Sequence, residues 1–504
     1  MAAFVLSNVI GLIRQILITR AFGTDASLDA FYAAARLPEI LFSLVAGGAL
    51  GSAFIPTFTG LIEKKKTRDA WKLASAISNL VTIVLVIASA IAWIFAPQLV
   101  SSIIAPEFAS AQQLLTVSLL RIQLLTPIIF GLSGLLMGML NAHQSFLLPA
   151  IAPSMYWLGM IFGVLFLVPS MGVHGLAWGA VLGAGLHLGV QLPGLLRLKP
   201  KYELILGLQQ ANVREVGRLM APRLLGVAAV QLNFLINTSI ASGMPEGSYT
   251  AIIVAFQVMT MPQVVIAQAI AIAALPTFSA QVAGGRIAEL RSSLAGTLRG
   301  VLLLSLPATV GLVLLRKPIV ALLFQRGEFG ADDTQLVAWA ILWYGVGLLG
   351  HSLVEIISRA FYALHDTRTP VIAGIGAMGL NVVLSLTLPG LFLQRGLMPH
   401  GGLALANSIA TTLEMIVLLI LMRNRLGGIE ANSLSKALAQ AALASGLMGA
   451  ALWLWLRHFG QSPFWLQAGA GILLGTTLYG LLVWLLKVPE LKTLLQALKQ
   501  RISR

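Results

Sequence analysis

Ile55-Pro56-Thr57-Phe58 and Leu275-Pro276-Thr277-Phe278 are nearly the same tetrapeptide and lie 220 residues apart in a chain of 504 residues. Other short motifs recur in the same order at offsets of 220 to 227 residues. They are Leu37-Pro38 with Met261-Pro262, Leu140-Asn141-Ala142-His143 with Phe361-Tyr362-Ala363-Leu364-His365, Pro149 with Pro370, and Gly175-Leu176-Ala177 with Gly402-Leu403-Ala404. A duplicated half is a common plan of membrane transporters, whose substrate path lies between the halves. The repeat therefore predicts movement of a substrate rather than chemistry on one.

The composition around these motifs is that of a membrane protein. Hydrophobic residues make up 58% of the chain and charged residues only 10%, and the mean hydropathy is +0.89. Soluble domains carry about 25% charged residues. Many segments stay apolar for the roughly 20 residues that a helix needs to cross a bilayer, and the alternating pattern of a membrane β-barrel does not dominate. We therefore expect an all-α, polytopic helical membrane protein.

The hydrophobic pattern predicts about fourteen transmembrane helices. They cover residues 3–22, 28–60, 70–97, 112–142, 146–169, 173–196, 213–242, 248–279, 289–315, 333–364, 369–392, 400–422, 434–456 and 464–486. Spans 1–6 and 7–12 form two pseudo-symmetric lobes of six helices in the same orientation, as in parallel-repeat carriers. The predicted domains are an N-lobe (1–196), a cytoplasmic linker (197–212), a C-lobe (213–426), spans 13 and 14 (427–486) and a cytoplasmic amphipathic tail (487–504).

The formal net charge of +15 is concentrated in loops on one side of the predicted membrane. Examples are Lys64 to Lys72, Arg197 to Arg218, and the tail from Lys487 to Arg504. This is the positive-inside pattern, which places both termini in the cytoplasm and the protein in the cytoplasmic membrane. Topology and attraction to anionic lipid explain these charges better than nucleic acid does. With no cysteine, disulfides and thiol chemistry are excluded.

Ionisable residues within the spans are the candidate functional residues, because charges inside a membrane are costly. Several of them share a narrow helix face with other polar residues, and four such polar stripes can enclose a hydrophilic cavity. The stripes are Ser7, Asn8, Gly11, Arg14, Gln15 and Thr19 on span 1; Asp29, Tyr32, Arg36, Glu39, Ser43 and Gly47 on span 2; His351, Ser352, Glu355, Ser358, Arg359 and Tyr362 on span 10; and Asn407, Thr411 and Glu414 on span 12.

The same charges could also neutralise each other inside the bundle. Arg36 with Glu39, and Glu355 with Arg359, have spacings that allow pairing along one helix. Arg14 has no acidic neighbour on its own span, and Asp29 is its best candidate partner. An unpaired guanidinium suits a phosphate, because its planar fork binds oxyanions through two hydrogen bonds.

Two arginines lie near the ends of predicted spans, and the sequence contains no recognisable catalytic motif. Arg121 and Arg223 lie near the starts of spans 4 and 7, where one of them serves as an interface anchor. No metalloprotease motif, no phosphate-binding loop and no pair of acids at a fixed spacing stands out. We therefore expect a transporter without a bound cofactor rather than an enzyme. Arg14 within the first apolar segment, with no small-residue cleavage site after it, argues against a cleavable signal peptide.

Longer motifs resemble the MurJ (MviN) family of lipid II flippases, in the MOP exporter superfamily. The most specific are Leu323-Phe324-Gln325-Arg326-Gly327-Glu328-Phe329 and the run from Arg359 to Pro370. Further matches are Gly11-Leu12-Ile13-Arg14, Ala21-Phe22-Gly23, Asp29-Ala30-Phe31, Phe54-Ile55-Pro56, Gly175-Leu176-Ala177-Trp178-Gly179 and Pro222-Arg223-Leu224-Leu225-Gly226. The resemblance covers essentially the full chain, and no single short motif carries it.

The resemblance implies a two-lobed transporter that flips the undecaprenyl-diphosphate-linked peptidoglycan precursor from the inner to the outer leaflet by alternating access. It also implies a cationic central cavity, a groove for the lipid tail at spans 13 and 14, and transport driven by the membrane potential or an ion gradient. A MOP-type exporter of another lipid-linked saccharide or small amphipathic molecule is the alternative. A membrane scaffold that has lost transport is a third possibility.

The chain departs from the family pattern within the expected cavity. Where the family typically carries charge, this sequence has the uncharged residues Asn8, Gln15, Phe42, Gln257 and Thr260. Fewer cations either weaken the case for a diphosphate substrate or transfer part of its binding to Arg36, Arg223 and Arg359. The chain also starts close to span 1, which is the pattern of a shortened N-terminus.

Overall fold

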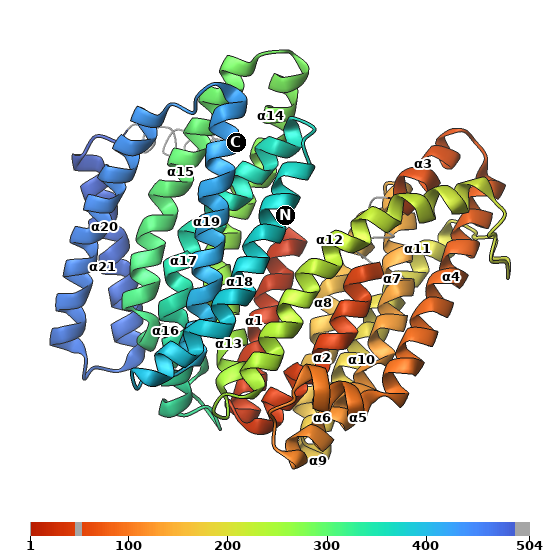
Figure 1. The fold of residues 1–504 in the computed structure, drawn as a ribbon, viewed down its shortest axis with the longest axis horizontal. Helices are drawn as coiled ribbons and strands as arrows, with labels where there is room; N and C mark the ends of the chain where they lie inside the picture. The colour runs from red at the N-terminus through yellow and green to blue at the C-terminus, as the bar shows by residue number, and fades with distance from the viewer. Residues whose placement is uncertain (1, 46–52, 489–504) are drawn as a thin grey trace. The chain divides into compact units, whose positions relative to one another are not determined.

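The computed structural model describes residues 2–45 and 53–488, leaving aside the side chains of residues 2–5, 221–223 and 225–226. Apart from turns and connections the described residues are helical, with short π-helical segments among the α-helices and no strand (Figure 1). They divide into two compact units, residues 1–250 with 326–329, and residues 251–325 with 330–504, apart from the undescribed positions.

The first unit contains the helices of the predicted spans 1 to 7. They are α1 (Ala2–Phe22), α2 (Ala26–Ser43), α3 (Ile55–Glu63), α4 (Thr67–Ile94), α5 (Ala96–Leu99), η2 (Val100–Ile104), α6 (Ser110–Gln123), α7 (Leu125–Ala142), α8 (Leu147–Phe162), η3 (Gly163–Leu167), α9 (Val168–Met171), α10 (Val173–Gly189), α11 (Leu192–Arg197) and α12 (Ala211–Ser242).

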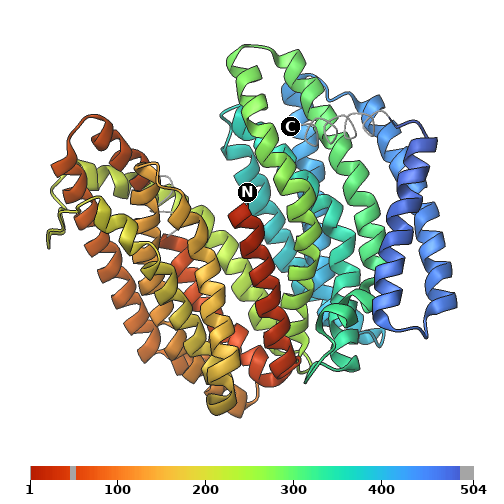
Figure 2. The same cartoon turned by 180° about the vertical axis from the view of Figure 1, so that it is seen from behind.

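The second unit contains nearly all of the remaining chain. Its helices are α13 (Ser248–Gln263, whose first turn belongs to the first unit), η4 (Val264–Gln268), α14 (Ala269–Ala283), α15 (Ile287–Leu314), α16 (Arg316–Phe324), α17 (Ala331–Ala363), α18 (Arg368–Gln394), α19 (His400–Leu426), α20 (Ala431–Phe459) and α21 (Phe464–Leu485). Helices α20 and α21 lie side by side next to α15 in both Figure 1 and Figure 2.

The duplication seen in the sequence is also present in the helices. Both α4 (Thr67–Ile94) and α15 (Ile287–Leu314) are 28 residues long, so both of their ends differ by 220 positions. The run Ser110–Ala142 and its counterpart Ala331–Ala363 are both 33 residues long. Lys65 and Gly285 precede the first pair, and both have a positive φ, of 58° and 68°. The two copies therefore share their turn geometry as well as their motifs.

Eleven helices in the described chain are long and apolar enough to cross a membrane. Over its described residues, each of the fourteen predicted spans coincides with a helix or a run of helices, and those outside the eleven are the predicted spans 1, 2 and 7. Between the long helices, Arg316–Phe324 forms the short helix α16. Residues 489–504 of the predicted amphipathic tail lie outside the described chain.

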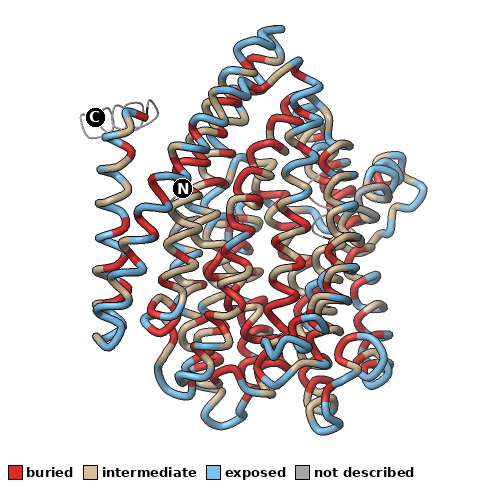
Figure 3. The backbone as a smooth tube through the Cα atoms, turned by 60° about the vertical axis from the view of Figure 1, so that its left-hand side comes forward, coloured by how far each residue is buried: buried red, intermediate tan, exposed pale blue. Residues whose placement is uncertain are grey.

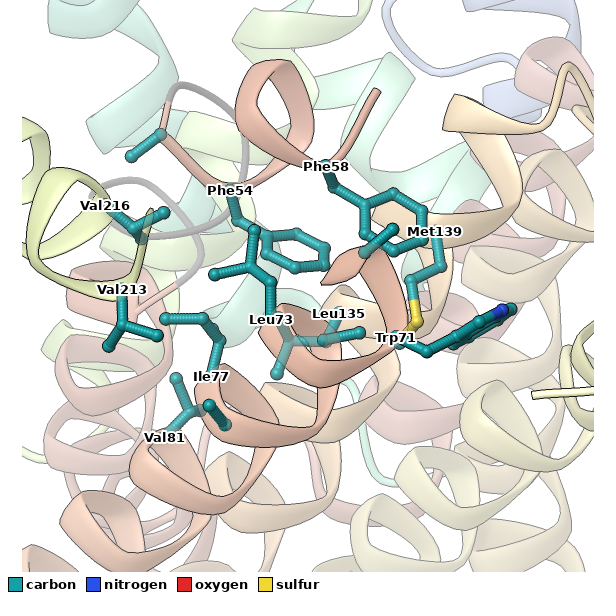
Figure 4. Close-up of a cluster of buried hydrophobic side chains, with 14 of the residues drawn as sticks. Phe54, Phe58, Trp71, Leu73, Ile77, Val81, Leu135, Met139, Val213 and Val216 are labelled. Atoms are coloured by element: carbon teal, nitrogen blue, oxygen red, sulfur yellow. The ribbon is translucent and has the colours of Figure 1, made fainter. Parts of the chain in front are cut away.

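Helix α12 begins the second repeat, yet it packs with the first unit. Its first turns place Val213 and Val216 against Phe54, Leu73 and other residues from α3, α4 and α7, as Figure 4 shows. The predicted lobes follow the sequence repeat, whereas the compact units follow how the helices pack. The two divisions of the chain therefore differ at α12. The lobe boundaries stay a prediction.

Burial along the helices follows what a membrane requires. Figure 3 shows buried and exposed residues alternating along the helices, rather than helices that are entirely covered. On α4, for example, Ile83, Ile87, Ile91 and Ile94 are exposed while Leu73, Ile77 and Leu85 are buried. Large apolar side chains on an outer helix face suit contact with lipid tails, so the exposed isoleucines mark the lipid-facing side of α4.

Candidate functional site

Arg14 on α1 is held by neutral groups. Its guanidinium stacks on the Trp157 ring at 4.2 Å from the ring centre. Its Nη2 donates a hydrogen bond to Gln15 Oε1 at 3.1 Å, and Nη1 lies 3.8 Å from the sulfur of Met160. Within residues 2–45 and 53–488, no carboxylate is within ion-pair distance of Arg14. A half-buried guanidinium with neutral neighbours can bind an oxyanion without first breaking a salt bridge.

The polar stripes of the first two spans meet at Gln15. Its Nε2 donates to the Tyr32 hydroxyl at 2.9 Å, and its Oε1 also receives the hydrogen bond from Arg14. Gln15 is buried on α1, and Tyr32 is half-buried on α2. The chain Arg14–Gln15–Tyr32 fixes the position of the guanidinium. Gln15 stands where the family typically carries a charged residue. In this structure its side-chain oxygen holds the neighbouring Arg14 guanidinium in place.

Asp29 does not pair with Arg14, so that prediction was wrong. The Asp29 carboxylate is buried, and it accepts hydrogen bonds from the backbone N–H of Gly247 at 2.8 Å and of Thr250 at 2.7 Å. The Thr250 hydroxyl donates a third, at 2.6 Å. These donors belong to the start of α13, where backbone N–H groups lack helical partners and the helix dipole favours an anion. Sequence spacing could not show this, because the partner lies 218 to 221 residues away.

Arg36 and Glu39 form the ion pair that their spacing allowed. Arg36 Nη1 lies 2.9 Å from Glu39 Oε2, and the Arg36 side chain is 15% exposed against 57% for Glu39. Arg36 also donates to the Tyr249 hydroxyl at 3.2 Å and lies 5.3 Å from the Phe234 ring centre. The cation of this pair is thus sheltered, whereas its carboxylate is exposed.

The second unit holds a second group of polar residues on α17 and α19. Arg359 Nη2 pairs with Glu355 Oε1 at 2.6 Å, and His351 Nε2 lies 3.0 Å from Asn407 Oδ1. The latter contact joins the two polar stripes predicted for spans 10 and 12. Glu414 is half-buried on α19 and packs against Gly374, where an added methyl would lie 3.4 Å from Oε1.

The structure gives the positions of the other residues singled out in the sequence, and their roles in a site stay predictions. Arg223 lies in α12, and its side chain is outside the described part of the chain. Phe42 packs against Phe130 with ring centres 5.1 Å apart. Thr260 donates to its own helix at Gln257 O, 2.8 Å away. Whether the polar stripes of both units enclose one cavity stays a prediction.

Trp157 and Tyr249 were not predicted as site residues, although they contact the two arginines. Each is an aromatic residue within an apolar span, and such residues usually fill space. What distinguishes them is their position over a guanidinium or within hydrogen-bond reach of one, and this depends on how α8 and α13 pack. No signal along the chain could have identified them.

An apolar cavity of about 470 Å³ lies within the second unit. It is bounded by residues of α13, α15, α16, α20 and α21, including Met261, Pro307, Leu452, Gly475 and Thr476. Nearly all of its lining is hydrocarbon. The hydroxyl of Tyr479, at its edge, donates to Leu303 O at 2.6 Å. Such a cavity is suited to an aliphatic chain rather than to a sugar or a peptide.

Residues 18–475 match the family model described as "Lipid II flippase MurJ". The chain belongs to this family. It is 33% identical over 428 residues to "Lipid II flippase MurJ" of Burkholderia cenocepacia, covering 83% of this chain and 82% of that protein. It is 29% identical over 484 residues to "Probable lipid II flippase MurJ" of Rhizobium tropici, covering 95% and 89%. Membership in the MurJ family confirms the prediction that the chain is a transporter and not an enzyme.

Solved structures agree on the fold. The structure titled "Lipid II flippase MurJ, inward closed conformation" aligns with a TM-score of 0.83 at 23% identity, over 96% of this chain and 98% of that one. An inward-facing multidrug resistance MATE family transporter of the MOP superfamily aligns with a TM-score of 0.69 at 16% identity, over 84% and 94%. The predicted all-helical, multi-pass membrane fold is thereby confirmed.

Proposed function

We propose that this chain flips lipid II, the lipid-linked peptidoglycan precursor, from the inner to the outer leaflet of the cytoplasmic membrane by alternating access. Membership of the MurJ family over residues 18–475 supports this substrate. The observation that carries the proposal is Arg14, a half-buried guanidinium within a membrane span whose contacts are all neutral. A buried charge of this kind is retained for a function, and a diphosphate is the anion that best fits a guanidinium fork.

The head group and the tail of such a substrate need different surroundings. We assign the diphosphate to Arg14, with Arg36 as a second cation and with Glu39, Glu355, Arg359, Arg223 and Asp29 as further candidate residues of the path. The apolar cavity beside α20 and α21 is the proposed site of the undecaprenyl tail. It supports the predicted groove at spans 13 and 14, because an aliphatic chain loses no hydrogen bonds on entering a cavity with so few polar groups.

Orientation and driving force belong to the same proposal. The basic loops, such as Lys64 to Lys66, would face the cytoplasm together with both termini, as the positive-inside rule requires. Lipid II carries negative charge on its diphosphate, so its outward movement is favoured by a membrane potential that is negative inside. An ion gradient is the other candidate driving force.

A bacterium depleted of its own lipid II flippase provides the test. The chain is expressed there, and the readout is cleavage of lipid II by an externally added lipid II-cleaving protein. We expect restored cleavage with the native chain and a loss of about tenfold to a hundredfold with Arg14→Ala, since a charged hydrogen bond contributes about 1.5–3 kcal/mol. Arg121→Ala is the matched control, because Arg121 also stacks on a tryptophan, at 4.5 Å, but lies on another helix.

The outcomes separate the candidate functions. Restored cleavage that depends on Arg14 and not on Arg121 establishes lipid II flipping. No cleavage from native protein that is shown to be folded and in the membrane refutes it and favours a MOP-type exporter of a different amphipathic molecule. Equal cleavage by the native protein and Arg14→Ala refutes only the role of Arg14 and leaves lipid II flipping supported.

A further inference from the structure

The connection between α11 and α12 is not a simple loop. Residues 201–208 are non-helical, and their exposure alternates, with Tyr202, Leu204, Leu206 and Leu208 exposed while the residues between them are half-buried. Leu204 is 85% exposed and Tyr202 is 65% exposed. The connection runs beside α4 as the yellow-green trace at the edge of the first unit in Figures 1 and 2. The Tyr202 hydroxyl donates to Asn79 Oδ1 at 2.7 Å, so the large apolar side chains that the segment presents away from the protein are Leu204, Leu206 and Leu208.

Side chains of α4 satisfy the backbone of this segment. Asn79 Nδ2 donates to Ile205 O at 2.8 Å and to Glu203 O at 3.2 Å. Ser75 Oγ accepts from the Glu203 N–H at 3.1 Å, and the Ile205 N–H donates to Glu203 O at 2.9 Å. Polar backbone groups need such internal partners where water is scarce. A water-exposed loop does not need them, so this arrangement fits a segment at the edge of the hydrocarbon.

The position of the segment along α4 supports the same conclusion. Exposed isoleucines on α4 run from Ile83 to Ile94. Counting the roughly 20 residues that span the hydrocarbon back from Ile94 reaches the region of Ser75, where the segment is attached. Exposed Arg68 lies beyond this level, nearer the start of α4. The segment thus lies between the lipid-facing stretch of α4 and its basic end.

The charges beside the apolar row are mostly basic. Lys201 is exposed within the segment, and Lys64, Lys65 and Lys66 are exposed in the turn before α4. Arg214, which follows the segment, donates through Nε to Leu208 O at 3.0 Å. Apolar side chains flanked by lysine and arginine are the pattern of a segment that inserts into an anionic leaflet, where each basic residue contributes about 1 kcal/mol.

From these observations we infer that residues 199–208, the segment together with exposed Lys199 and with Pro200 before it, form an interfacial anchor. Leu204, Leu206 and Leu208 insert into the acyl-chain boundary of the leaflet on the side of the basic loops. Lys199 and Lys201 bind the head groups of anionic phospholipids there. The anchor fixes the edge of the first unit to this leaflet, and it is independent of which substrate the chain moves.

Single cysteines can test this directly, because the native chain contains none. Leu204→Cys in the full chain is spin-labelled and reconstituted in vesicles of phosphatidylethanolamine and phosphatidylglycerol. Power saturation with oxygen and with a water-soluble nickel chelate measures depth. Ile87→Cys on the lipid-facing side of α4 and Lys65→Cys in the turn before α4 are the two reference positions. We expect the label at residue 204 to be less accessible to nickel than at residue 65 and less accessible to oxygen than at residue 87, as an interfacial depth requires; a nickel response like that at residue 65 would overturn the inference.

A second comparison tests the role of the head groups. The Lys199→Gln/Lys201→Gln double variant carries the same label at residue 204, and each protein is also placed in vesicles of phosphatidylcholine alone. We expect phosphatidylglycerol to lower the nickel accessibility of the native-charge protein by several-fold and to leave the double variant unchanged. If both proteins respond equally to phosphatidylglycerol, Lys199 and Lys201 do not bind the head groups.

Discussion

At the scale of single residues, the charges that look alike in the sequence have different roles. Arg14 has only neutral contacts, Arg36 is paired with Glu39, and Asp29 binds backbone N–H groups at the start of α13. The pairing of residues three or four apart could be predicted, because helix geometry alone determines it. The partners of Arg14 and Asp29 could not, because they depend on how distant helices pack.

The hydrogen bonds of the buried Asp29 carboxylate should stabilise the fold, and a substitution can test this. Both of its carboxylate oxygens accept hydrogen bonds, so Asp29→Asn must point its NH₂ group at an N–H donor. A buried donor left without a partner costs about 1–3 kcal/mol. We expect Asp29→Asn to lower the midpoint of thermal unfolding in detergent. Asp25→Asn is the control, because exposed Asp25 caps α2 at Leu28 and asparagine caps as well as aspartate does. Equal midpoints for the two variants would contradict this role of Asp29.

At the scale of helices, glycine determines how closely α8 and α10 pack. A methyl group added at Gly183 would lie 2.4 Å from Tyr156 O, and one added at Gly159 would lie 2.2 Å from the Cα of Gly183. Glycines spaced four apart let backbones approach closely in membranes, where apolar burial does not drive helices together. The small residues Ala46-Gly47-Gly48-Ala49 predict close packing of the same kind, and they lie outside the described chain.

Two glycines on α10 allow a matched comparison. Gly183→Ala forces α8 and α10 apart, and overpacking of this kind costs about 1–3 kcal/mol. Gly185→Ala meets nothing within 4 Å, so it should be neutral or stabilise the helix by up to about 1 kcal/mol. Thermal unfolding of the two purified variants measures the difference. A Gly183→Ala variant as stable as Gly185→Ala would show that the helices adjust without cost.

At the scale of the whole molecule, the predicted function needs a place for an aliphatic tail as well as for a diphosphate. Thr476→Trp fills the cavity that α20 and α21 help to line. Displacing even two methylenes, at ~0.8 kcal/mol each, weakens tail binding about tenfold. We expect a comparable loss of lipid II exposure in the depleted bacterium. Thr477→Trp, on an exposed neighbouring position, should keep activity, and an active Thr476→Trp variant would rule the cavity out as a tail site.

The general architecture could be predicted further than the candidate site. Hydropathy and the repeat identified the membrane class and the helical stretches, because apolar runs and internal symmetry are visible along the chain. Trp157 and Tyr249, which contact the two arginines of the first unit, could not be found in this way. Long-range packing places them, and one sequence does not encode it as a pattern.

The two copies of the repeat have also diverged unevenly in length. The turn before α4 (64–66) and that before α15 (284–286) both have three residues, and those before α8 (143–146) and α18 (364–367) both have four. Between α9 and α10 there is one residue, whereas 395–399 separate α18 from α19. Smaller differences occur elsewhere, as between 23–25 and 243–247 and between 105–109 and 325–330, so the connection at 395–399 has the largest difference in length, four residues. Residues 395–399 are therefore where an epitope or a fluorescent protein can be placed with least disturbance.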